Sequence, residues 1–189
     1  GIERWSVLGQ SFGGFTALHY LSSRPDALRA VYFTGGLPAV GRSAEEIYAA
    51  CYETMAGKSE EYYRRFPSDR DRVARLVGLA GQEAIRTPGG DLVGPSRLRS
   101  LGHLLGASGG AERLHYLLER DPGSRGFRHD LAGLLPFGGR NVLYTVLHES
   151  SYADGVVTNW AAARTLPGAF RADPTLLTGE HVGRAVFEE

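Results

Sequence analysis

The sequence is poor in the features that mark secreted, membrane and nucleic-acid-binding proteins. Cys51 is the only cysteine among 189 residues, so no disulfide can form within the chain, and this favours a reducing compartment such as the cytoplasm. No apolar run approaches the roughly 20 residues of a membrane-spanning helix. The 21 basic and 21 acidic side chains are mixed along the chain and form no basic block. The sequence therefore predicts no contact with nucleic acid or with an anionic membrane.

Residue spacing also argues against a metal or a nucleotide cofactor. His115 and Glu119 lie four residues apart, as on one face of a helix, but the pattern supplies no third ligand. The glycines near the N-terminus lack the G-x-G-x-x-G spacing of a dinucleotide loop, and no acidic residue ends the next apolar segment. We therefore expect the chain to work without a metal or other cofactor.

What the sequence does contain first is the pattern of a β-α-β unit. Residues 5–9, WSVLG, form a short apolar run typical of a buried strand. Residues 12–23 carry apolar side chains at helical spacing, and Pro25 follows them. Residues 29–34, RAVYFT, are β-branched and aromatic. A strand, a helix and a strand within about thirty residues predict two parallel strands joined by a crossover helix.

After Pro38 the periodicity becomes helical, and we place a domain boundary there, between residues 1–38 and 39–189. The first of these helices is expected to bury a stripe of Ile47, Cys51 and Met55. Residues 141–149, NVLYTVLHE, fit either a strand or a helix. Helix starts are predicted at Ser43, at Ser59, at Ser68 and at Thr158 or Asn159.

The G-x-S-x-G pattern occurs twice, in different settings. In Gly106–Gly110, GASGG, it falls between two helical stripes, so Ser108 is expected to lie in a plain connection. In Gly9-Gln10-Ser11-Phe12-Gly13 it falls between a predicted strand and a predicted helix. That order is required of a nucleophile elbow, in which a strained turn exposes the serine hydroxyl. We expect Gly9 and Gly13 to avoid clashes with neighbouring backbone, and the Phe12 N–H to donate to an oxyanion.

The motifs together resemble those of the prolyl aminopeptidases (proline iminopeptidases), serine peptidases of the α/β-hydrolase superfamily. The resemblance lies in GQSFGGF, YLS and TGGLP near the N-terminus, and in HESSYADG and TGEHV further on. It implies an α/β fold: a partial α/β-hydrolase core over residues 1–38, followed by a mostly helical cap domain over 39–189. It further implies release of an N-terminal proline from a peptide through an acyl-enzyme on Ser11, with a free peptide N-terminus as the partner.

In this family, carboxylates of the cap hold the substrate's α-ammonium group, and Glu149 and Glu180 are the candidates here. A carboxylate in a partly dry pocket favours a cation and rejects a blocked N-terminus. The alternative for each glutamate is a solvated charge. Tyr152, together with Trp160 and Phe137, is a candidate wall for the proline ring, the alternative being ordinary core packing.

The sequence departs from the family pattern at the catalytic partners. α/β-hydrolases place an aspartate and then a histidine after later strands, and no strand signal of that kind follows the helical segment. His148 beside Glu149 and His181 beside Glu180 could each be named as a base, with Asp154 or Asp173 as orienting groups, but we expect these histidines to be satisfied polar side chains instead. The expectation is that the chain is an internal piece of a longer hydrolase and has little activity alone, since a serine without a base is a poor nucleophile.

Two other functions stay open at this point. An esterase would share the fold and Ser11 but would need no ammonium site. A non-catalytic homologue would keep the shape and act as a binding module. Ser11 argues against epoxide and haloalkane hydrolases, which generally have an aspartate at the elbow.

Overall fold

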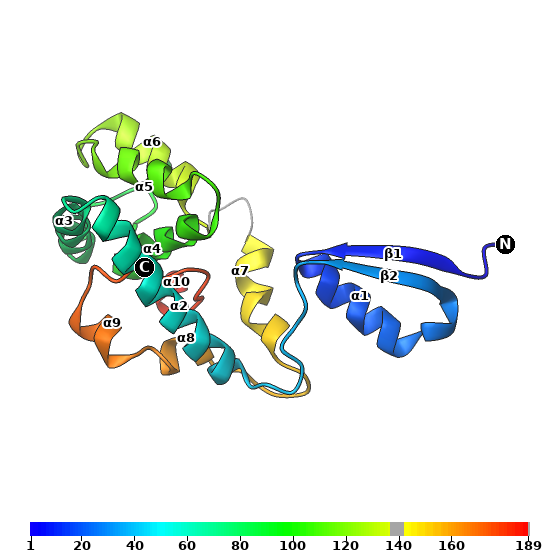
Figure 1. Ribbon diagram of the computed structural model, residues 1–189. Coiled ribbons are helices and arrows are strands. Elements are labelled where there is room, and N and C mark those ends of the chain that lie inside the picture. The colour runs from blue at the N-terminus through cyan, green and yellow to red at the C-terminus, as the bar shows by residue number, and fades with distance from the viewer. Residues whose placement is uncertain (137–141, 189) are drawn as a thin grey trace. The chain divides into compact units, whose positions relative to one another are not determined.

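The structure is a computed structural model that describes residues 1–136 and 142–188 (Figure 1). It divides into two compact units, Gly1–Ser43 and Ala44–Glu189, called here the first unit and the second unit. The predicted boundary near residue 38 lies a few residues before this division. Among the described residues, no helix is long and apolar enough to cross a membrane.

The first unit is the β-α-β unit that the sequence predicts. Strand β1 (Trp5–Gln10) leads through Ser11 into helix α1 (Phe12–Ser23), and the short 3₁₀-helix η1 (Pro25–Ala27) leads into strand β2 (Leu28–Thr34). The two strands pair in parallel, with Val7 opposite Val31 and Gly9 opposite Phe33. Figure 1 shows α1 packed along this two-stranded sheet.

One face of the sheet carries the small core of the first unit. Gly9 on β1 and Ala17 on α1 are buried where strand and helix meet. Because side chains alternate along a strand, the residues next to Gly9 and Phe33 point the other way. These are Leu8 and Tyr32, with exposed fractions of 67% and 57%. The opposite face of the sheet is therefore apolar and exposed.

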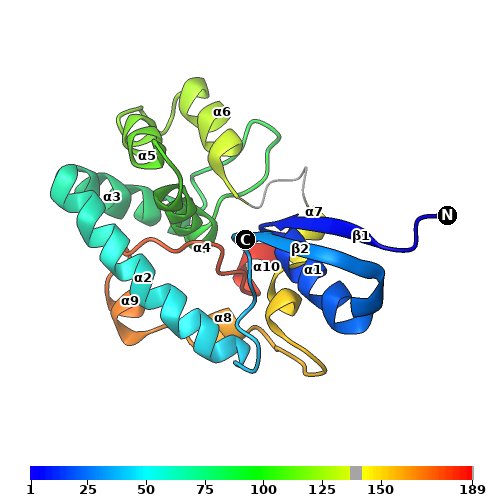
Figure 2. The ribbon, with the colours of Figure 1, turned by 45° about the vertical axis from the view of Figure 1, so that its right-hand side comes forward.

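The second unit is built from helices in the residues described (Figures 1 and 2). Residues 142–148 are helical, which settles the open choice for the 141–149 segment, apart from Asn141, which lies outside the described residues. The elements in chain order are α2 (Ala44–Arg65), α3 (Asp69–Gly81), α4 (Pro95–Arg99), η2 (Ser100–Gly106), α5 (Gly110–Leu118), α6 (Arg125–Leu134), α7 (Val142–His148), η3 (Glu149–Tyr152), α8 (Ala161–Arg164), α9 (Gly168–Ala172) and α10 (Ala185–Glu188).

Helix α2 is the central element of this core. Met55 of the predicted stripe is buried as expected, but two other predictions about the helix were wrong. Its buried face includes Tyr48, Tyr52, Met55, Ser59 and Tyr62, whereas the predicted stripe residues Ile47 and Cys51 are only half-buried. The tyrosines carry the larger apolar surface, so they rather than Ile47 take the inner face. Ser59 starts no helix: it is fully buried within α2 and donates to the Met55 carbonyl oxygen at 2.8 Å.

A buried carboxylate joins three of the helices. Asp69, at the start of α3, is fully buried and accepts hydrogen bonds from the Tyr62 hydroxyl of α2, from Arg72 Nη1 at 2.7 Å and from His115 Nδ1 of α5 at 2.9 Å. Ser68, the predicted cap of α3, makes no side-chain capping hydrogen bond. Burial of Asp69 is tolerated because donors surround its oxygens.

The second G-x-S-x-G segment is a connection between helices, as expected. It joins η2 to α5, and Ser108 is exposed. Gly109 has a φ of 69°, and a β-carbon on Gly110 would lie 1.8 Å from the Leu104 carbonyl oxygen. The glycines of this segment therefore serve a tight turn.

Candidate functional site: a strained serine and a carboxylate cluster

Ser11 occupies a strained corner between β1 and α1. Its φ of 52° and ψ of −124° place a non-glycine residue in a region that L-amino acids rarely adopt, at a cost on the order of 1–3 kcal/mol. The corner is held by backbone hydrogen bonds: the Ser11 N–H donates to the Gly35 carbonyl oxygen at 3.1 Å, and the Gly14 N–H donates to the Ser11 carbonyl oxygen at 2.8 Å. Ser11 is exposed, and its hydroxyl does not cap α1.

Three glycines make this corner possible. A β-carbon on Gly9 would lie 2.4 Å from the Gly13 carbonyl oxygen, and one on Gly14 would lie 2.3 Å from the Gly36 carbonyl oxygen. A β-carbon on Gly36, whose φ is +89°, would lie 1.9 Å from the Ser11 carbonyl oxygen. The prediction for Gly9 is confirmed. The prediction for Gly13 was wrong, because a β-carbon there meets no atom within 4 Å and the crowding falls one residue later.

The N-terminus of α1 presents free donors beside Ser11. Phe12 is the first residue of the helix, and the first N–H groups of a helix have no partner within it. The positive end of the helix dipole lies at the same place. The Phe12 side chain is 61% exposed and its ring stacks on that of Phe15, with centroids 5.7 Å apart. Ser11 and the Phe12 N–H thus lie together at one helix end.

The first unit does not supply a general base to Ser11. Its only histidine, His19, is exposed and lies eight residues further along α1, about 12 Å of helix rise away. General-base catalysis needs a base within hydrogen-bond reach of the hydroxyl. A histidine base for the Ser11 hydroxyl would therefore have to come from outside this unit.

A separate polar cluster lies within the second unit and includes all three predicted substrate-binding residues. Glu149 and Tyr152 come from η3, and Glu180 comes from the loop that precedes α10. The imidazole of His148, at the end of α7, interacts with both carboxylates. The Tyr152 ring lies 5.4 Å from that of His148 and 5.5 Å from that of Tyr48, centroid to centroid. The fold therefore brings together residues about thirty positions apart in the sequence.

Glu149 caps a helix. Its exposed fraction is 6%, its Oε1 accepts the Ala161 N–H at 3.0 Å and its Oε2 accepts the Ala162 N–H at 3.2 Å, both at the start of α8. The alternative of a solvated charge is therefore wrong for Glu149. The predicted cap at Thr158 or Asn159 was also wrong, because the chain enters α8 through two left-handed residues, Asn159 and Trp160.

Glu180 is the exposed carboxylate of the pair. Its Oε1 accepts a hydrogen bond from the Tyr144 hydroxyl of α7 at 2.7 Å. Burial and this bond to Glu180 raise the pKa of Tyr144, so Tyr144 stays a donor. Sequence reasoning missed Tyr144. Its spacing of four residues from His148 would have pointed to it, had residues 141–149 been assigned to a helix.

Burial favours the neutral form of His148 and of His181, the residue that follows Glu180. Burial lowers the pKa of His148, against the opposing effect of Glu180 and Glu149. Burial also lowers the pKa of His181, to about 4. Burial thus disfavours an imidazolium beside the two glutamates. A cation that enters the cluster meets negative charge that the histidines do not cancel.

The candidate aromatic wall is only partly described. Phe137 lies outside the described residues. The Trp160 ring packs on Phe187, with centroids 5.5 Å apart. A cavity of about 210 Å³ is lined by Tyr52, Arg99, Thr178 and His181 among others. Glu149, Tyr152 and Glu180 do not line it.

Comparisons with known proteins find two curated relatives of the chain. No protein-family model matches the chain. The proline iminopeptidase of Aeromonas sobria is 38% identical over 195 aligned positions, which cover 98% of this chain and 45% of that protein. The proline iminopeptidase aneH of Aspergillus aculeatus is 28% identical and covers 99% of this chain and 43% of that protein. The chain spans somewhat less than half the length of these curated relatives, and over that span it is similar to both proline iminopeptidases.

Proposed function

We propose that this chain carries the nucleophile and part of the substrate site of a serine-type proline aminopeptidase with an α/β-hydrolase fold. The observation that carries the proposal is the strained corner at Ser11, between a parallel strand and the helix α1. Ser11 Oγ attacks the carbonyl carbon of the N-terminal prolyl residue and its proton passes to a base. The C–N bond then breaks, the shortened peptide leaves as an amine, and water hydrolyses the prolyl ester. The Phe12 N–H stabilises the oxyanion.

The second part of the proposal concerns the substrate's N-terminus. The protonated secondary amine of proline is a cation with two N–H donors, and Glu180 is the exposed acceptor of the cluster. Both oxygens of Glu149 already accept backbone N–H groups, so its part is chiefly its negative charge. Tyr152 supplies an aromatic surface within the cluster, against His148 and Tyr48. A peptide with a blocked N-terminus would lose the charge-assisted hydrogen bond that this arrangement offers.

A binding experiment tests the substrate site on the chain itself. The 189-residue chain is titrated with L-prolinamide and, in parallel, with N-acetyl-L-prolinamide, and amide chemical shifts are followed by NMR. Binding of the free amine alone, weakened about tenfold or more in Glu180→Gln, is expected for a charge-assisted contact. Equal binding of both compounds would contradict the ammonium site.

A transplant tests the chemistry. The 189 residues replace the aligned segment of the Aeromonas sobria proline iminopeptidase, and hydrolysis of a proline arylamide is measured with and without Ser11→Ala. We expect turnover that Ser11→Ala abolishes, whereas the 189-residue chain alone turns over little or no arylamide. Activity that survives Ser11→Ala would refute the nucleophile. Hydrolysis of acetyl esters without hydrolysis of the arylamide would favour the esterase alternative.

A further inference from the structure

We propose that Arg99 is a positioning residue that sets the place of Glu180 through the backbone of residues 170–178. This inference rests on the proposed role of Glu180 in substrate binding. Arg99 is the last residue of α4 and does not belong to the polar cluster described above. It reaches Glu180 only through the chain segment that leads to it.

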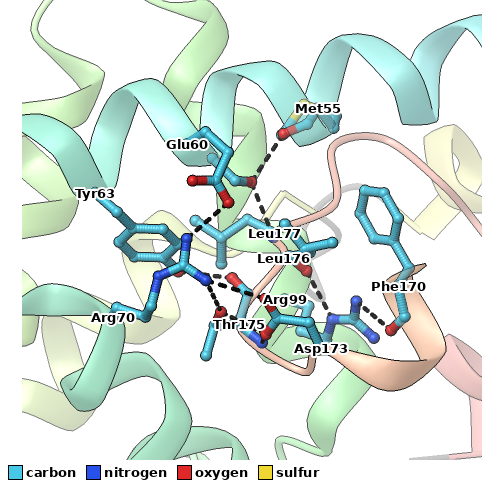
Figure 3. Close-up of polar contacts among 11 residues, drawn as sticks. Met55, Glu60, Tyr63, Arg70, Arg99, Phe170, Asp173, Thr175, Leu176 and Leu177 are labelled. Atoms are coloured by element: carbon cyan, nitrogen blue, oxygen red, sulfur yellow. Dashed lines mark hydrogen bonds and ion pairs between the residues drawn. The ribbon is translucent and has the colours of Figure 1, made fainter.

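Arg99 holds both ends of this segment. Its Nη2 donates to the Phe170 carbonyl oxygen and its Nε to the Leu176 carbonyl oxygen, each at 2.9 Å (Figure 3). The backbone oxygen of Arg99 accepts the Thr178 N–H, also at 2.9 Å. One residue of α4 thus makes three hydrogen bonds to the backbone of residues 170–178, the last of them two positions before Glu180.

The surroundings of Arg99 indicate that these bonds are its principal contacts. Burial lowers the pKa of its guanidinium. Within residues 1–136 and 142–188, no carboxylate lies within 4.0 Å of it. A half-buried cation without an anionic partner is costly unless its donors are satisfied, and here backbone carbonyls satisfy them. A neutral or differently shaped side chain could not hold the same two carbonyls, since the planar guanidinium presents donors in a fixed fork.

Other contacts leave the segment little freedom between these anchors. Figure 3 shows Arg70 directed at Asp173, with a distance of 3.0 Å from Nη1 to Oδ2. The Tyr63 hydroxyl donates to the Thr175 carbonyl oxygen at 2.6 Å, and the Leu177 N–H donates to Ser59 Oγ at 3.1 Å. Thr178 also presses on η2, because a β-carbon on Gly102 would lie 2.5 Å from its carbonyl oxygen.

These contacts fix the place from which the chain enters the loop that carries Glu180. Arg70 and Tyr63 hold the segment around residues 173–175. Nearer the loop that carries the carboxylate, the Arg99 guanidinium holds Leu176 and the Arg99 backbone oxygen holds Thr178. From there, the Gly179 N–H donates to His181 Nδ1 at 3.1 Å, which closes the loop, and Glu180 meets the Tyr144 hydroxyl. Loss of the Arg99 contacts should therefore let the Glu180 carboxylate move while the helices stay folded.

The test compares variants of the 189-residue chain. Arg99→Gln removes the fork, Arg99→Lys keeps the charge and one donor group, and Arg72→Gln is the matched control, because Arg72 bonds to Asp69 and not to residues 170–178. The measurements are L-prolinamide affinity, amide hydrogen exchange at Leu177 and Thr178, and the NOE between the Tyr144 ring and the Glu180 side chain. We expect Arg99→Gln to weaken binding about tenfold or more, consistent with lost charged hydrogen bonds, and Arg99→Lys to weaken it less.

A double-mutant cycle separates positioning from general destabilisation. If Arg99 acts through Glu180, Arg99→Gln weakens binding no further once Glu180→Gln is present, so the two effects are not additive. Additive losses, or an equal loss in Arg72→Gln, would overturn the inference. If the parent chain binds no prolinamide, the proposed function fails, and the NOE between Tyr144 and Glu180 then tests the positioning role alone. Persistence of this NOE in folded Arg99→Gln or Arg99→Lys overturns the positioning role. Loss of the NOE in both variants, with retention in Arg72→Gln, supports the positioning role.

Discussion

The α-carbon of Gly36 lies so close to Ser11 that a β-carbon on it would approach the Ser11 carbonyl oxygen to 1.9 Å. Ser11 directly follows β1, and Gly36 lies in the loop that follows β2. Gly35, next to Gly36, accepts the Ser11 N–H. The backbone strain at Ser11 is thus held by a loop that follows the second strand, and the loop tolerates no side chain at its point of contact.

A pair of substitutions in that loop should separate the energetic cost of the close contact from the cost of the backbone conformation. Gly35 and Gly36 both have positive φ, but a β-carbon on Gly35 meets no atom within 4 Å. Gly35→Ala should cost about 1 kcal/mol for the left-handed conformation alone. Gly36→Ala should cost clearly more, because the Ser11 carbonyl must also move. Urea unfolding followed by Trp5 fluorescence in a Trp160→Phe background measures both. Equal losses would show that the close approach does not exist.

The elbow glycines give a second matched pair. Gly9→Ala should destabilise the first unit by several kcal/mol or displace α1, because its β-carbon would lie 2.4 Å from the Gly13 carbonyl oxygen. Gly13→Ala should be neutral or stabilising by up to about 1 kcal/mol, since Gly13 lies within α1 with open space around it. Thermal unfolding monitored by circular dichroism measures the difference. A Gly13→Ala variant as damaged as Gly9→Ala would mean that the observed crowding is misplaced.

The parts of the fold that sequence alone predicted are those with strong local signals. The β-α-β unit follows from two apolar runs around a helical stripe, and its two strands pair in parallel as predicted. The reasoning on Gly13 failed because crowding depends on where α1 crosses the β2 loop. That is a tertiary relationship, and it selects Gly14 and Gly36 instead.

The second unit was harder for the same reason. Ile47 and Tyr48 are adjacent on α2, and periodicity alone does not tell which neighbour faces inward when both are apolar. Ser59 has the residue type of a helix cap, yet its hydroxyl links α2 to Leu177, a contact across more than a hundred residues. Glu149 likewise caps a helix from outside its own sequence. Such long-range side-chain hydrogen bonds leave no local pattern.

The two glutamates of the cluster should differ in what their loss affects. Glu149→Gln should lower the free energy of unfolding by about 1–3 kcal/mol, because an amide cannot accept both backbone N–H groups of α8 with two oxygens. Glu180→Gln should change stability little, since Glu180 is exposed. Chemical denaturation and prolinamide titration of both variants measure the contrast. The division of roles fails if Glu180→Gln is the less stable protein.

Asp69 should be the most sensitive carboxylate in the second unit. Asp69→Asn removes a fully buried charge that accepts bonds from Tyr62, Arg72 and His115, and a loss of about 3 kcal/mol or more is expected. Asp71→Asn, two residues further along α3 and exposed, is the matched control and should lie within about 0.5 kcal/mol of the parent. Urea unfolding of the two variants decides, and similar midpoints would argue that Asp69 is not held as the structure places it.

Stability should depend on pH through His181. Burial lowers its pKa in the folded chain to about 4, from 6.5 in an exposed setting. Between those values the unfolded chain binds more protons than the folded one, so the free energy of unfolding falls as the pH is lowered through this window. At about 1.4 kcal/mol per pKa unit, the full effect is on the order of 3 kcal/mol. Burial lowers the pKa of His148 as well, so it adds to the same trend.

The trend can be assigned by removing one histidine at a time. In His181→Gln the fall in stability between about pH 6.5 and pH 4 should be much smaller, because the largest buried titration is gone. His129→Gln is the control: the His129 side chain is 84% exposed, so its removal should leave the pH dependence unchanged. Urea unfolding at half-unit pH steps, followed by near-ultraviolet circular dichroism of the buried tyrosines, gives the slopes. If His181→Gln and the parent chain lose stability in parallel, His181 is protonated without cost and is not packed between Tyr48 and Tyr52 as the structure has it.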